Sequence, residues 1–575
     1  MPDNKGAQSF TITINGQAMP DSVGLLEIVV TKLVNSIPKA KIIVKDGSAS
    51  AQDFELSNKA DFIPGSEITV AAGNGGENET IFSGIIVSQT IKADREGSIL
   101  EIECRDKAVK LTAGRKNKVF EEMSDGDVVE QIISDAGLTA DVTDLKTQHK
   151  QLVQYNVSDW DFIVTRTELN SALVIAENGM LKIAPPDFNQ ASAATYTYGA
   201  EIYEFEVQMD ARTQYPKVLT KSWSYTNQEI QEGESTETTL PEQGNVSGSD
   251  LANVLGWENS SFYHTGNVAN EESASWATAA LFRSRLNKIS GSFRVIGDHK
   301  LKPGIIVELL GIGERFSGKC LVTGVTQSYS NQAAWYSHVQ FGLDKTLHNF
   351  KYDDVTDKQA SGIIPAVNGL QIGIVTEIHD DPAGENRIRV KMPMVDNQGD
   401  GIWARLASLD AGNGRGWVWN PELNDEVIVG FLNDDPRDAV ILGSLYSSAK
   451  APHITADEEN KQKGILTREK LQILFDDDKK IIKISTDAGN TITLDENGKA
   501  IKIVDQNGNK LEMTSEGITI ESGKDIILKA SGDVKIKATN ISESASAELK
   551  LEGSGGAELS SSAIAKIKGS IVQIN

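Results

Sequence analysis

IIKISTDAGNTITLDENGKAIKIVDQNGNKLEMTSEGITIESGKDIILKASGDVKI, residues 481–536, repeats one short unit. In each unit two apolar residues stand at positions i and i+2, and the units follow one another at steps of seven to ten residues. Side chains at i and i+2 lie on the same face of a β-strand, so every pair predicts a short strand with one apolar face. The pairs are Ile482/Ile484, Ile492/Leu494, Ile501/Ile503, Leu511/Met513, Ile518/Ile520, Ile526/Leu528 and Val534/Ile536.

The length of the unit bears on how the strands pair. A parallel β-helix made by one chain needs about twenty residues per coil, whereas steps near eight residues cover only one side of a triangle. Three chains wound together would supply the three sides, and a lone chain would leave its strand edges unpaired. We therefore expect residues 464–575 to form an intertwined triple-stranded β-helix, a rigid needle, in a homotrimer. A meander of antiparallel hairpins is the alternative, favoured by the Asn-Gly turns at 497–498 and 507–508.

The length, net charge and cysteine content of the chain restrict its number of domains and its classes of partner. A chain of 575 residues is too long for one hydrophobic core, so we expect about three or four domains. The net charge of −25 argues against a surface for nucleic acid or for anionic lipid. Cys104 and Cys320 are interpreted as buried reduced thiols.

The chain carries no recognisable export or membrane signal. The first ten residues, MPDNKGAQSF, lack the layout of a signal peptide, and no apolar run approaches the ~20 residues of a membrane span. We expect synthesis in the cytoplasm, with export by a route that uses no cleaved signal.

Residues 1–355 are predicted to be mixed α+β. Strand patterns occur in SFTITING, LEIVVTKLV and residues 65–93. Ser124 and Ser158 each stand three residues before an aspartate and ahead of apolar residues, which predicts two capped helices. A third helix is expected over 271–288, and the polar stretch 227–250 is interpreted as a mobile surface loop.

Residues 366–448 are predicted to form a small closed β-barrel of the OB type. The prediction rests on five short strand candidates: Gln371–Ile378, Arg387–Met392, Gly401–Ala404, Glu426–Phe431 and Ala439–Leu442. Trp403, Trp417 and Trp419 could form a stacking surface, but the acidic chain favours packing in the barrel core or between subunits.

Candidate catalytic groups are few. Asp434, Asp435 and Asp438 lack the spacing of a calcium loop, and the proline beside them favours a turn. Carboxylate pairs such as Asp380/Asp381 are interpreted as solvated turns, because 81 acidic residues make adjacency common. The seven histidines show no ligand spacing. We expect no catalytic residues, metal or cofactor, and hence no enzyme.

Two regions resemble a known family. LTAGRKNKVFEEMSDGDVVEQIISDAGL (111–138) and QYNVSDWDFIVTRTELNSALVIAENGMLKI (154–183) look like the tail hub of VgrG spike proteins and contractile phages. VKMPMVDNQGDGIWARLAS (390–408) and PELNDEVIVGFLNDDPRDAVILGSLYSS (421–448) are similar to the OB domain that follows this hub. Asn424 departs from the family pattern, which has glycine there, and the 17 residues 447–463 are too few for the lysozyme that some phage needles carry.

The resemblance implies a trimeric spike at the tip of a contractile injection system, either type VI secretion, an extracellular phage-tail-like particle or a phage tail. It implies a hub with β-barrel-containing domains that binds the inner tube and baseplate proteins. Sheath contraction would drive the needle through a target envelope, with transient membrane contact and possible effector cargo.

The end of the needle is the predicted binding site for a separate tip protein of the PAAR kind. Three copies of the terminal residues would present a small apolar triangle there. The residues are Ile571, Val572, Gln573, Ile574 and Asn575. A trimeric tail fibre or adhesin, and a cell-wall-degrading tail enzyme, remain as alternative functions.

Overall fold

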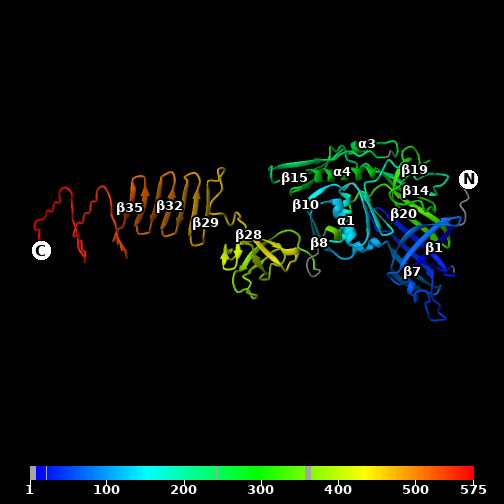
Figure 1. Cartoon of the computed structure of the whole chain (residues 1–575), viewed down its shortest axis with the longest axis horizontal. Helices are drawn as coiled ribbons and strands as arrows, with labels where there is room; N and C mark the ends of the chain where they lie inside the picture. Colours follow the sequence, from blue (N-terminus) through cyan, green and yellow to red (C-terminus); the bar gives the residue numbers. More distant parts are fainter. Residues whose placement is uncertain (1–7, 21, 144, 241–242, 357–363, 575) are drawn as a thin grey trace. The chain divides into compact units, whose positions relative to one another are not determined.

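The computed structural model describes residues 8–20, 22–143, 145–240, 243–356 and 364–574 (Figure 1). Contacts between residues divide the chain into two compact units. The first comprises Met1–Gln371 with Gly430–Val440, and the second comprises Ile372–Val429 with Ile441–Asn575. The three predicted domains, 1–355, 366–448 and 464–575, remain a proposal.

The first unit is built on a large sheet, for which the described residues give 13 strands. The path of neighbouring strands is β14-β18-β21-β20-β3-β4-β7-β6-β5-β1-β2, with β19 joining β20 to β13. Their bounds are β1 Gln8–Ile14, β2 Gln17–Ala18, β3 Leu25–Leu33, β4 Lys39–Lys45, β5 Glu67–Asn74, β6 Glu77–Ala93, β7 Ser98–Arg105, β13 Ala194–Thr197, β14 Glu204–Met209, β18 Ile289–Ile296, β19 Ile306–Leu310, β20 Gly318–Ser330 and β21 Ala333–Phe341.

Alternation of residues places one face of this sheet in the core. In β4, Ala40, Ile42 and Val44 are buried while the lysines at both ends are exposed. The strand–turn–strand prediction for residues 65–93 is confirmed by β5 and β6, which pair antiparallel.

Smaller sheets and short helices complete the unit. The sheets contain β8 Lys116–Ser124 with β10 Gln148–Val157; β9 Thr139–Val142 with β11 Leu173–Glu177 and β12 Met180–Ala184; and β15 Val218–Ser224 with β16 Glu229–Glu234 and β17 Ser260–His264. The α-helices are α1 Asp125–Asp135, α2 Asp159–Glu168, α3 Gly248–Ala252, α4 Asn270–Leu286, α5 His348–Lys351 and α6 Asp353–Thr356. Single 3₁₀ turns span Ala60–Phe62, Lys107–Thr112, Asn253–Leu255 and Leu432–Asp434. None of the described helices is both long and apolar enough to span a membrane.

The predicted helix starts are confirmed. The Ser124 hydroxyl accepts a hydrogen bond from the Asp127 N–H while the Asp127 carboxylate accepts from the Ser124 N–H, forming a capping box for α1. Ser158 caps α2 through the Asp161 N–H. The helix predicted over 271–288 is α4.

The interpretation of residues 227–250 as a mobile loop is wrong. Residues 229–234 form β16, which pairs antiparallel with β15, and residue 248 begins α3. Gly233 is part of the reason why this polar segment is an ordered strand and not a loop. A Cβ at this position would lie 2.8 Å from backbone atoms of α4. The glycine thus lets the strand approach the helix closely.

Residues 371–444 contain a closed five-stranded barrel, and this prediction is confirmed for the described residues. Its strand order is β22-β23-β24-β28-β27. The bounds are β22 Gln371–Glu377, β23 Ile388–Lys391, β24 Ile402–Leu406, β27 Glu426–Phe431 and β28 Ala439–Ser444, with a small hairpin of β25 Ala411–Gly412 and β26 Arg415–Gly416 between β24 and β27.

The C-terminal repeat forms one flat ladder of strands within a single chain. Seven strands pair consecutively and antiparallel in the described residues: β29 Gln462–Leu466, β30 Gln472–Asp476, β31 Ile481–Ser485, β32 Thr491–Asp495, β33 Ala500–Val504, β34 Lys510–Thr514 and β35 Gly517–Glu521 (Figure 1, orange). Within the single chain the observed arrangement is thus the hairpin meander, and pairing of strands between chains stays a prediction. Residues 522–574 contain no paired strand within the chain.

Candidate assembly surface

The apolar pairs of the repeat meet one another across the C-terminal sheet. Ile482 lies opposite Leu494, and Leu494 lies opposite Ile501. Ile484, Ile492 and Ile503 continue a second row in the same way. The register therefore lines up the pairs into two apolar rows on one face, from β30 to β35.

This apolar face is uncovered in the single chain. Ten of its side chains are between 36% (Met513) and 68% (Ile518) exposed. They are Phe475, Ile482, Ile484, Ile492, Leu494, Ile501, Ile503, Met513, Ile518 and Ile520. A contiguous exposed face of this kind marks an interaction surface.

The opposite face of the same sheet is mostly polar. Lys483, Thr493 and Lys502 stand opposite one another on β31, β32 and β33. Lys502 also forms an ion pair with Glu512 at 2.8 Å. The sheet thus has one apolar face and one mostly polar face.

The predicted tip residues lie at the end of the unpaired segment. Ile571, Val572, Gln573 and Ile574 are exposed, and the structure brings no other described element to them. Asn575 lies outside the described residues. Binding of a tip protein here stays a prediction.

The acidic cluster of residues 434–438 is a turn, as predicted. Asn433 and Asp434 have positive φ angles of 54° and 56°. Asp435 is buried and accepts hydrogen bonds from the Arg437 backbone N–H and guanidinium, with an ion-pair distance of 2.6 Å. These hydrogen bonds lower the pKa of Asp435. The carboxylate therefore fixes the connection between β27 and β28.

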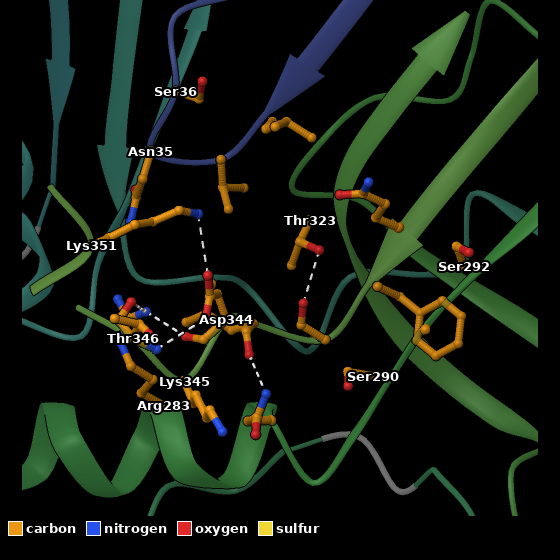
Figure 2. A pocket seen from close by; sticks show the side chains of 18 of the residues that line it. Asn35, Ser36, Arg283, Ser290, Ser292, Thr323, Asp344, Lys345, Thr346 and Lys351 are labelled. Atoms are coloured by element: carbon orange, nitrogen blue, oxygen red, sulfur yellow. Dashed lines mark hydrogen bonds and ion pairs between the residues drawn. The ribbon is translucent and has the colours of Figure 1, made fainter. Parts of the chain in front are cut away.

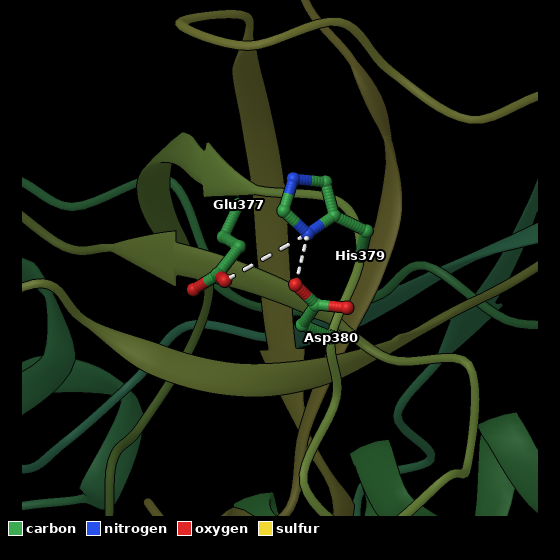
Figure 3. A group of neighbouring side chains, drawn as sticks. All are labelled: Glu377, His379 and Asp380. Atoms are coloured by element: carbon green, nitrogen blue, oxygen red, sulfur yellow. Dashed lines mark ion pairs between the residues drawn. The ribbon is translucent and has the colours of Figure 1, made fainter.

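A second polar cluster was missed by sequence reasoning. Glu377, His379 and Asp380 lie close enough to share a cation, with His379 Nδ1 3.0 Å from Asp380 Oδ2 and 4.0 Å from Glu377 Oε1 (Figure 3). Glu377 is also paired with Arg389 at 3.4 Å. The short spacing E-x-H-D was the available signal. Because His379 and Asp380 are exposed and Glu377 is already paired with an arginine, we interpret the group as a surface ion-pair network.

The tryptophans of the barrel domain do not fill its core. Trp417 and Trp419 are 48% and 52% exposed, and their ring centroids are 6.3 Å apart. Trp403 is half-buried on the barrel exterior, with the Arg389 guanidinium carbon 5.8 Å from its ring centroid. The barrel-core interpretation is therefore wrong for Trp417 and Trp419, and packing between subunits remains.

The first unit contains a cavity of about 620 Å³, lined by both polar and apolar side chains (Figure 2). Arg283 donates to the carbonyl oxygens of Asp344 and Thr346 and pairs with Glu168 at 2.6 Å. Lys351 pairs with Asp344 at 3.2 Å. Arg283 lies on α4 and Glu168 on α2, so these contacts hold the segment that follows β21 against the two helices. The cavity wall is therefore explained by structural ion pairs and hydrogen bonds.

Both cysteines are free and buried, as predicted. Burial raises the pKa of the Cys104 thiol to about 12 and also raises that of Cys320. Burial thus disfavours the thiolate, which is the nucleophilic form of cysteine.

Residues 4–331 match the family described as the Alg8 N-terminal domain. The chain belongs to this family. Residues 371–446 of this Alg8-family chain match the "Type VI secretion system/phage-baseplate injector OB domain", in agreement with the five-stranded barrel.

Curated relatives confirm the resemblance to VgrG-type spike proteins. The type VI secretion system spike protein VgrG4b of Pseudomonas aeruginosa is 39% identical over 95 residues, 15% of this Alg8-family chain and 11% of the relative. The actin cross-linking toxin VgrG1 of Vibrio cholerae is 32% identical over 114 residues, 18% of this chain and 10% of the relative. The aligned segments thus span only about a tenth of these relatives.

Solved structures align with a larger share of the chain, but at low TM-scores and low sequence identity. A tail protein from Neisseria meningitidis has a TM-score of 0.44 at 12% identity, covering 60% of this Alg8-family chain and 98% of its own. The Francisella PdpA–VgrG complex has a TM-score of 0.39 at 9% identity, covering 90% and 80%. Both overlaps are too distant to define the fold further.

Proposed function

We propose that this chain is a non-enzymatic, trimeric spike of a contractile injection apparatus, in which the hub joins the inner tube and baseplate to a needle. The observation that carries the proposal is the uncovered apolar face of β30–β35. The OB match and the VgrG relatives support the same role.

Association of apolar faces has a large driving force. Burying one half-exposed isoleucine contributes about 1 kcal/mol, so ten such side chains give on the order of 10 kcal/mol per chain before the entropic cost of association. Three sheets with their apolar faces inward make a triangular prism whose outer faces carry Lys483, Lys502 and Glu512. The prism would be narrow and resistant to bending.

The needle then has two parts with different pairing. The strands of residues 462–521 form backbone hydrogen bonds with one another within each chain. Residues 522–574 keep the apolar pairs Ile526/Leu528 and Val534/Ile536 without any in-chain partner strand. Their backbone groups need partners from other chains once the apolar side chains are buried. We assign the intertwined triple-stranded β-helix to this second part.

The needle end is the proposed seat of a tip protein. Ile571, Val572 and Ile574 of three chains would leave an apolar triangle exposed to solvent. A PAAR-like protein would cover it, and effector cargo could travel with such a tip or with the hub. On sheath contraction the capped needle would puncture the target envelope.

Two substitutions on adjacent residues of β32 test the proposal. Ile492→Asp puts a carboxylate on the apolar face and should weaken association by about 3–5 kcal/mol per chain, because the charge is buried without a partner. Thr493→Asp, on the opposite face between Lys483 and Lys502, should leave association unchanged.

The readout is the oligomeric state over a dilution series, measured by analytical ultracentrifugation. Dissociation of Ile492→Asp but not of Thr493→Asp supports the prism. Equal behaviour of both variants would contradict it.

A further inference from the structure

An exposed arm leaves the barrel between β24 and β27. All fourteen residues from 407 to 420 are exposed. The hairpin of β25 and β26, the hydrogen bond from the Ser408 hydroxyl to the Trp417 carbonyl oxygen, and the Asp410–Arg415 ion pair at 2.6 Å hold its shape. The arm is therefore formed, although the barrel does not cover it.

The arm carries more apolar surface than a solvated loop needs. Leu409 is 87% exposed and Val418 is 84% exposed, and the tilted pair Trp417 and Trp419 stands beside them. Four large apolar side chains within fourteen exposed residues indicate a segment that is buried in the working assembly.

The outer surface of the same barrel has an apolar sector. Side chains of a strand alternate between the barrel interior and the exterior. In β22, β27 and β28, which are neighbours in the closed barrel, the outward positions that carry apolar side chains are Ile372, Ile374, Ile428, Val440 and Leu442. Ile372 and Leu442 are exposed.

The remaining sector of the barrel's outer surface is mainly charged. Outward positions of β23 and β24 are Arg389, Lys391, Trp403 and Arg405. The apolar sector is therefore local, and it is a surface distinct from the arm. One barrel thus offers two different apolar surfaces.

A threefold ring requires two different interacting surfaces on each subunit. In a head-to-tail ring each subunit uses two different complementary surfaces, whereas a twofold dimer pairs one surface with itself. We propose that the arm of one copy packs on the outer face of β22, β27 and β28 in the next copy. This inference rests on the proposed trimer and names the contact that closes its barrel layer.

A sugar is the competing occupant. The arm and residues 378–388 line a cavity of about 710 Å³ that contains Trp417 and Trp419. Several of its charged groups are paired with one another, as in the Arg387–Asp381 pair at 2.6 Å and the Arg415–Asp410 pair at 2.6 Å. Leu409 and Val418 are apolar and nearly fully exposed, which suits a protein partner better than a hydroxyl-rich ligand.

Photo-crosslinking of the full chain tests the proposal. Val418 is replaced by benzoylphenylalanine, and Gln398, an exposed polar residue of another barrel loop, is replaced in a matched control. We expect a dimer-sized band several-fold stronger for the probe at 418 than for the control. Its cross-linked peptides should contain residues of β22, β27 or β28.

Native mass spectrometry of the same samples separates the two proposals. A trimer whose probe at 418 cross-links only within its own chain would overturn the arm contact and leave the spike proposal intact. A monomer would overturn both. Saturable quenching of tryptophan fluorescence by chitohexaose in the trimer, lost in Trp417→Ala, would overturn the arm contact in favour of a sugar site.

Discussion

Asp435 illustrates what one residue does in this molecule. Its carboxylate accepts hydrogen bonds from the backbone and side chain of Arg437, inside a turn whose preceding residues have positive φ. The composition of the turn, Asn-Asp-Asp-Pro-Arg, made this role predictable from sequence, since Asn and Asp tolerate that conformation and proline fixes the bend. Which of the three aspartates is buried was not predictable, because it depends on the barrel around the turn.

Removing this carboxylate should change the acid stability of the protein. The pKa of Asp435 is lowered in the folded chain, so its contribution to stability is complete above the unfolded pKa of about 3.9 and is lost as the pH falls through the folded value. Asp435→Asn should lower the melting temperature at pH 7, and the difference from the unmodified protein should shrink below about pH 4.

Calorimetric melting curves from pH 7 to pH 3 give the measurement. Asp438→Asn, an exposed acid of the same turn, is the control and should shift the melting temperature little at any pH. A pH-independent loss in Asp435→Asn would contradict the assigned role of the ion pair.

Among the elements, helix starts and barrel strands followed from local chemistry. Ser124 and Ser158 cap their helices through neighbours three residues away, so the signal is contained in the sequence. β16 was not predicted, because two features that define it depend on the tertiary fold. These are its pairing with β15 and the close approach of Gly233 to α4. The order of the large sheet is likewise non-local, since β3 pairs with β20.

The repeat shows why strand content and strand pairing are separate problems. Apolar residues at i and i+2 predict strands in either a meander or an intertwined helix, because both bury one face. The turns decide between them: Lys499 and Gly508 have positive φ in tight connections of the observed meander. The i, i+2 pattern predicted the strands and one apolar face, but it did not predict that residues 462–521 pair as a meander within one chain.

The needle end gives a prediction at the scale of an element. Deletion of residues 569–575 should abolish capture of the PAAR-like tip protein in a pull-down, because the apolar triangle is removed, and should leave the oligomeric state unchanged. Lys568→Ser, which alters an exposed residue just before the deleted segment, is the control and should still capture the tip protein. Retained capture by the shortened needle would contradict the proposed binding site.

For the whole molecule, the proposed assembly contains three copies of the chain. The exposed faces of the C-terminal sheet, the unpaired residues 522–574 and the arm at 407–420 all lack partners in the single chain. The proposed trimer would cover all three of these surfaces. The repeat pattern predicted the apolar face of the C-terminal sheet, while the arm and the apolar sector of the barrel became visible only in the structure.

The mass of the purified full-length protein in solution tests this claim most directly. Light scattering coupled to size-exclusion chromatography should give three times the mass of one chain, unchanged on dilution. A monomer or a dimer would contradict the account, because neither closes a threefold prism.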